Sequence, residues 1–73
     1  MSDARQAIAA AIEAGAGTVA QEELKKAEDH LDAAEERISE KAYTAARREA
    51  MTAKQNALDA LSIAEQQQDQ SQP

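Results

Sequence analysis

Alanine supplies most of the apolar side chains in this 73-residue chain and limits what its core can contain. Nineteen residues are alanine, whereas Phe, Trp and Cys are absent and Tyr occurs once. Alanine has the highest helix propensity and loses no side-chain entropy on folding. β-Branched and aromatic residues are too few to build strands. The sequence therefore predicts helices packed closely through small side chains, in one domain near the lower size limit for a stable core.

The charge and the apolar pattern exclude several classes of partner. A net charge of −6 argues against a nucleic acid or an anionic membrane surface. No apolar run approaches the roughly 18 residues that indicate a transmembrane helix. The absence of Cys removes disulfides, thiolate ligands and a thiol nucleophile together. No small-molecule substrate or cofactor is expected.

Local signals predict the first helix and the start of the second. Ala4, Ile8 and Ala11 recur at helical spacing up to Gly15-Ala16-Gly17, which predicts a first helix over about 3–15. Thr18-Val-Ala-Gln21 then has the pattern of a capping box. We expect the second helix to begin at about residue 19.

The position of the next turn follows from the phase of the apolar residues. The second helix carries an apolar stripe only about 80° wide, which ends at Ile38. The next apolar set begins at Tyr43, and this five-residue step rotates the stripe by roughly 140°. One straight helix could not bury both stripes against one surface. We therefore predict a turn within about 39–44, between antiparallel helices over 19–40 and 43–65.

The third helix has a broader apolar face than the second. Its centre is a row of alanines at helical spacing: Ala46, Ala50, Ala53, Ala57, Ala60 and Ala64. Larger residues flank this row, so the helix can contact two neighbours. Ile63 instead projects to the opposite, polar side. The predicted fold is an all-α, three-helix domain over 1–65, with a short first helix packed on an αα-hairpin through close alanine contacts. The polar segment 66–73 is expected to be a disordered tail.

No pattern in the chain indicates catalysis or metal binding. His30 is the single histidine and lacks the converging ligands that a transition metal requires, so we expect a solvated surface residue. Adjacent carboxylates such as Glu35-Glu36 are interpreted as a solvated acidic face, because acid–base catalysis needs a desolvated cleft. The chain is predicted not to be an enzyme, with no catalytic, cofactor or metal residue.

The third helix holds the candidate interaction surface. Its alanine row is interpreted first as an internal interface, and alternatively as a face that pairs with another copy or lies in a partner's groove. Arg47 and Lys54 border the row and could meet an acidic partner. Tyr43 is expected to fill the end of the hairpin, with recognition of a partner as the alternative. The surface comprises Tyr43, Ala46, Arg47, Ala50, Met51, Ala53, Lys54 and Leu58.

Several short motifs resemble a known family. They are Asp3-Ala-Arg-Gln-Ala-Ile8, Ala14-Gly15-Ala16, Glu23-Leu24, and the run from Tyr43 through Ala46, Ala50, Ala53, Ala57 and Ala60. The chain resembles an alanine-rich helical domain of unknown function found in bacterial envelope lipoproteins, often alongside OmpA-like domains. The resemblance covers nearly everything except the glutamine-rich tail. Two positions depart from it: the family's Ala-Pro before Glu-Leu is Ala20-Gln21-Glu22 here, and its Gly-Asp before the tyrosine is Lys41-Ala42.

The resemblance implies a non-enzymatic role and a location. It points to the periplasm or the outer-membrane-associated envelope, with a lipid anchor upstream, and the alternative location is the cytoplasm. The leading hypothesis is a structural or protein-interaction module that associates with itself or with another protein. The alternative hypothesis is a small acidic protein that sequesters metal ions or other cations.

Overall fold

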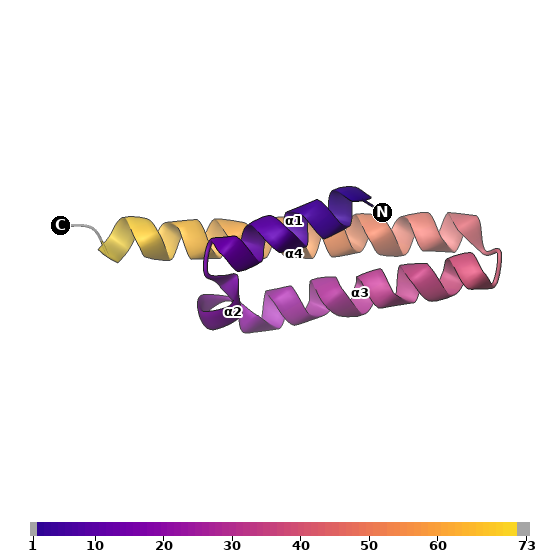
Figure 1. Ribbon diagram of the computed structural model, residues 1–73, viewed down its shortest axis with the longest axis horizontal. Coiled ribbons are helices and arrows are strands. Elements are labelled where there is room, and N and C mark those ends of the chain that lie inside the picture. The colour runs from indigo at the N-terminus through magenta and orange to yellow at the C-terminus, as the bar shows by residue number, and fades with distance from the viewer. Residues whose placement is uncertain (1, 72–73) are drawn as a thin grey trace.

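This computed structural model describes residues 2–71, with side chains described for 2–67. The described residues form four helices joined by short turns. They are α1 (Ser2–Glu13), α2 (Ala16–Val19), α3 (Gln21–Ser39) and α4 (Tyr43–Ser71). Helices α3 and α4 pack antiparallel along most of α3, and α1 lies on them (Figure 1). The molecule is elongated, with extents of 51 × 17 × 14 Å. The predicted all-α fold, a short first helix on an αα-hairpin, is confirmed.

The turn of the hairpin lies where the phase of the apolar stripe predicted it. Helix α3 ends at Ser39, and α4 begins at Tyr43. Lys41 has a left-handed backbone, with a φ of 63°. Its N–H donates to the carbonyl of Ile38 at 2.9 Å, and the N–H of Ala42 donates to that of Arg37 at 2.8 Å. These two bonds form a Schellman motif, which satisfies carbonyls that the end of α3 leaves unpaired.

The first helix ends at Glu13, just before the first glycine and two residues short of the predicted end. Gly15 adopts a φ of 96°, which is strained for any residue with a Cβ. Its N–H donates to the carbonyl of Ile12 at 3.0 Å. The glycine therefore turns the chain away from α1 and toward the hairpin.

The predicted capping box at Thr18 is wrong. Thr18 lies inside α2, and the N-cap of α3 is Ala20, which makes no side-chain cap hydrogen bond. The extra turn of helix brings Ala16 and Ala20 into the core, where they are 0% and 2% exposed. A capping box at Thr18 would contribute about 1 kcal/mol. The chain instead buries Ala16 and Ala20, so packing outweighs the cap at this point.

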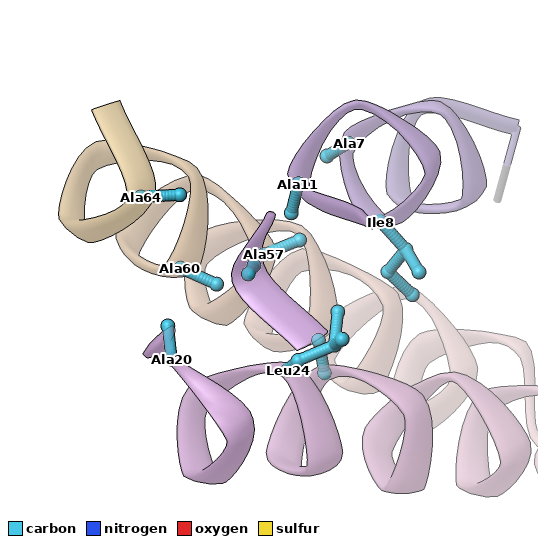
Figure 2. Close-up of a cluster of buried hydrophobic side chains, with 10 residues drawn as sticks. Ala7, Ile8, Ala11, Ala20, Leu24, Ala57, Ala60 and Ala64 are labelled. Carbon is cyan, nitrogen blue, oxygen red and sulfur yellow. The ribbon is translucent and has the colours of Figure 1, made fainter. Parts of the chain in front are cut away.

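The core consists almost entirely of alanine side chains from all the helices. Figure 2 shows Ala7 and Ala11 of α1 facing the row of Ala57, Ala60 and Ala64 on α4. Only two larger side chains of the described residues are buried, Ile8 and Leu24. Helix α4 contacts both α1 and α3, as the breadth of its apolar face predicted. The alanine row on α4 is therefore an internal interface over most of its length.

Two expectations about α4 need correction. Ile63 was assigned to the polar side, but it is half-buried and packs against the core. Helix α2 contacts α4 in addition to α1 and α3, so more of the circumference of α4 is covered than two neighbours would cover. Helix α4 extends to Ser71, into the segment 66–73, and the disorder expected for that segment stays a prediction. Glutamine has good helix propensity and no Gly or Pro interrupts residues 66–71. Residues 72–73 lie outside the described residues.

The left-handed residue in the hairpin turn gives the first prediction. We expect Lys41→Gly to raise the free energy of unfolding by about 1 kcal/mol, because a Cβ makes this conformation costly. Ala42→Gly is the matched control, since Ala42 does not have a positive φ, and it should not stabilise. Urea unfolding followed by circular dichroism measures both. Equal effects of the two glycines would contradict the assigned turn.

The close contacts of α4 give the second prediction. Ala53 is 0% exposed, so Ala53→Leu should lower the free energy of unfolding by about 1–3 kcal/mol through overpacking. Gln55→Leu, on the exposed side of the same helix, should change it by less than about 0.5 kcal/mol. The same urea experiment compares the two, and a neutral Ala53→Leu would mean that α4 faces a loose gap at this residue.

Candidate interaction site

Helix α1 covers only part of the hairpin. In Figure 1 α1 lies over the middle of α4, its N-terminal end lies toward the hairpin turn, and the turn between α3 and α4 lies beyond that end. The side chain of Asp3 meets that of Lys54 at 3.8 Å, which marks this level on α4. From Lys54 back to Tyr43, α4 runs for about 16 Å, or three turns. Along this stretch α4 has α3 beside it, but α1 does not extend over it.

A groove opens where α1 stops. Its volume is about 340 Å³, and we call it the turn-end groove. Three helices contribute to its lining: Asp3 and Ala4 from α1, Ile38 from α3, and Tyr43, Ala46, Arg47, Ala50, Met51 and Lys54 from α4. Ala46 is buried and Ala50 is half-buried, whereas Ile38, Tyr43 and Met51 are 40%, 61% and 65% exposed. The groove therefore combines small buried residues with large exposed apolar side chains.

Six of the eight residues predicted from the sequence as an interaction surface line this groove. The other two lie elsewhere: Ala53 is fully buried among the helices, and Leu58 is 39% exposed and not part of the lining. Ile38, Asp3 and Ala4 also line the groove and were not among the predicted residues. The only signal for them was the shortness of the first helix, which leaves the end of the α3 stripe without a third helix.

The role expected for Tyr43 inside the hairpin is wrong. Its side chain is 61% exposed and lines the groove instead of filling the end of the hairpin. Tyr43 is the first residue of α4, next to the hairpin turn. The single aromatic residue of the chain is therefore available at the surface.

The rim of the groove carries two cations. Lys54 faces Asp3, whose side chain is 78% exposed, so this contact is long and well solvated. Arg47 forms no ion pair with any side chain among residues 2–67. In contrast, Arg37 near the turn donates to Glu40 at 2.7 Å, and this hydrogen bond and the charge of Glu40 raise the pKa of the Arg37 guanidinium. Arg47 is thus a positive charge at the edge of the groove without an ionic partner among the described side chains.

His30 lies at the surface, as the sequence predicted, but it also has a neighbour on α4 that the sequence did not indicate. Its Nδ1 lies 3.5 Å from Oε2 of Glu49, which joins α3 to α4, and the two side chains are 37% and 32% exposed. The antiparallel pairing brings Glu49 across from α3, which sequence spacing alone could not show. Over the described part of the chain, no three His, Cys, Asp or Glu side chains converge as a metal site would require.

A second groove lies between α1 and α3. It has a volume of about 330 Å³ and is lined by Arg5, Ile8, Ala9, Ile12, Glu28, Leu31 and Asp32. Arg5 pairs with Glu35 of α3 at 2.9 Å. The sequence analysis did not predict this groove. It contains one exposed large apolar residue, Ile12, against three in the turn-end groove, so it indicates a partner less clearly.

The fold and the groove define a small helical bundle with an open apolar site. Within the described residues, every helix is too short or too polar to span a membrane. The chain belongs to the family described as a domain of unknown function, DUF4398, which matches residues 1–73. A search of the curated proteins and a search of the solved structures each found no match. The family description assigns no function, so the groove has to be interpreted from its own chemistry.

The exposure of the groove residues gives the third prediction. Met51→Ser and Tyr43→Ser should each lower the free energy of unfolding by less than about 0.5 kcal/mol, because both side chains are mostly exposed. Leu24→Ala should lower it by about 2–4 kcal/mol, since Leu24 is 7% exposed in the core. Thermal unfolding of the three variants tests this contrast. A large cost at Met51 would show that the groove is closed in solution.

Proposed function

We propose that this chain is a non-enzymatic interaction module of the bacterial cell envelope that binds a partner protein through its helix surfaces. The observation that carries the proposal is the turn-end groove, where Ile38, Tyr43 and Met51 are exposed together. Apolar patches bordered by polar residues are typical of protein-interaction sites. The rest of the exposed surface is strongly charged, so this cluster is not explained by an overall apolar surface.

The chemistry of the groove supports binding over catalysis. Its ionisable side chains are Asp3, Tyr43, Arg47 and Lys54. Both partners of the Asp3–Lys54 contact are about half or more exposed, at 78% and 48%. Acid–base catalysis depends on desolvated groups whose pKa values are shifted toward the working pH. The groove instead exposes Tyr43, Met51 and Arg47, residue types that are enriched where proteins contact one another.

The envelope location rests on the family resemblance. The motifs around Asp3–Ile8 and Tyr43–Ala60 are similar to those of domains in envelope lipoproteins, often beside OmpA-like domains. In that setting a small helical module would sit near the outer membrane, with a lipid anchor upstream of it. Its task there would be to hold another protein or a further copy of itself.

The fourth prediction tests this function in cells. A photo-crosslinking amino acid at Met51 of the native gene product should give a discrete adduct with a protein in the envelope fraction. The matched control places the same amino acid at Lys25, which is exposed on α3 away from the groove lining, and it should give little adduct. A product found only in the cytoplasmic fraction, with equal adducts from both positions, would contradict the proposal.

Calorimetric titration with Ca²⁺ and Zn²⁺ should show no saturable binding, whereas stoichiometric binding would favour cation sequestration.

A further inference from the structure

We infer that the turn-end groove is the seat of a partner helix of about three turns, which continues the line of α1 and has acidic residues beside its apolar face. This inference rests on the proposed function and specifies the partner's chemistry. It depends on three features of the groove: its continuity with the seat of α1, its length and the charge on its rim.

The groove continues an interface that already holds a helix. Helix α1 packs through Ala7 and Ala11 onto the alanine row of α4 at Ala57 and Ala60 (Figure 2). The same row runs on at helical spacing to Ala50, which is half-buried, and to Ala46, which is already buried, and both line the groove. Small side chains allow a helix to approach closely, and α1 demonstrates that a helix fits on this row. A second helix can therefore use the part of the row that α1 does not reach.

The length of the groove matches a short helix. The groove begins at Lys54, beside the first turn of α1, and extends to Tyr43 at the start of α4. This stretch of about 16 Å corresponds to about 11 residues of a helix lying parallel to it. The exposed Ile38, Tyr43 and Met51 line the groove along this length, so a helix seated there would cover all three. Apolar grooves that bind amphipathic helices are a common mode of peptide recognition.

The charge on the rim selects an acidic helix. The lining contains Arg47 and Lys54, although the whole chain has 14 acidic and 8 basic residues. The Asp3 carboxylate is 3.8 Å from Lys54 and highly exposed, so it neutralises Lys54 only weakly. Arg47 has no ionic partner among the described side chains. Acidic residues flanking the apolar face of the partner would meet both cations, and complementary charge of this kind gives specificity.

A second copy of the chain is a poorer occupant than a helix of another protein. Outside the groove, the exposed large apolar side chains of the described residues are Ile12, Val19 and Leu58. They belong to three different helices, α1, α2 and α4, and do not form a stripe along one helix. The apolar faces of the three long helices are already used within the bundle. A second copy therefore has no free apolar stripe of three turns to insert.

The test presents helices to the groove on the chain itself. A helix of about 12 residues, with a Leu/Ala face and Glu on both flanks, is joined to the N-terminus through a short Gly/Ser linker. Tethering gives an effective concentration of roughly millimolar, so even weak seating is detected. One control helix has the same composition with its apolar positions scattered around the helix. A second control carries Lys in place of Glu. None of the three helices contains an aromatic residue.

Tyr43 provides the readout, because it is the only aromatic residue in the chain and it lines the groove. With the Glu-flanked helix, the rate constant for acrylamide quenching of tyrosine fluorescence should fall by about half or more relative to the scattered helix. Met51→Glu should restore the rate, since it places a charge in the apolar seat without disturbing the core. Arg47→Glu should weaken protection by the Glu-flanked helix, and the Lys-flanked helix should protect less than the Glu-flanked one.

Three outcomes would overturn the inference. Equal quenching with the Glu-flanked and scattered helices would show that the groove seats no helix. Equal protection by the Lys-flanked and Glu-flanked helices would exclude an acidic partner. A dimer of the untethered chain in sedimentation equilibrium, abolished by Met51→Glu, would assign the groove to a second copy. None of these results depends on the cellular crosslinks. If the groove binds no helix but Met51 still crosslinks to an envelope protein, the proposed function stands and only this inference fails.

Discussion

The close approach of helices through alanine is the constraint on which this structure depends. Each buried methyl group removes little apolar area from water, so stability comes from many small contacts. Such contacts form only where helices lie near one another, and a core of this kind has little room for bulk. Larger apolar residues are consequently placed at the edges: Leu31, Leu61 and Ile63 are partly buried around the alanine cluster. Ile38, Tyr43 and Met51 have no such place and remain exposed. Polar residues would be tolerated at these positions, so their apolar character agrees with the proposed binding role.

A surface of repeated alanines specifies register poorly, since a shift by one turn replaces one methyl group with another. Polar contacts at fixed positions supply the missing information. Arg5 forms an ion pair with Glu35 of α3, Asp3 forms one with Lys54 of α4, and the His30 ring contacts Glu49 across the hairpin. Each pair of long helices is therefore joined by one of these contacts. Their side chains are about a third or more exposed, so each pair contributes little free energy. Their effect lies in disfavouring the alternative alignments of α1, α3 and α4.

The sequence predicted the two chain reversals because helix geometry and backbone conformation alone determine where they occur. A five-residue step from Ile38 to Tyr43 cannot be accommodated on one straight helix, and Gly15 supplies a left-handed turn, so both reversals could be located. Thr18 failed as a signal because a local capping pattern is weaker than burial of Ala16 and Ala20, which only the folded chain reveals. The candidate site was predicted in part for a similar reason. Periodicity shows which face of α4 is apolar, but it cannot show how far α1 reaches along that face. The exposure of Ile38 and Tyr43 depends on that reach.

The unequal lengths of α1 and α4 also shape how the bundle opens. Helices α3 and α4 are neighbours in sequence and bury their contacts along most of α3, so the hairpin is a locally connected unit. Helix α1 is short, and exposed ion pairs join it to both partners. Detaching α1 therefore costs less free energy than separating the hairpin, and it is the natural first step of partial unfolding. When α1 is detached, the part of the alanine row that Ala7 and Ala11 cover, at Ala57 and Ala60, is uncovered on that side of α4. The α1 helix of a second molecule could then take the same place. The more weakly α1 is attached, the more readily two molecules would exchange this helix.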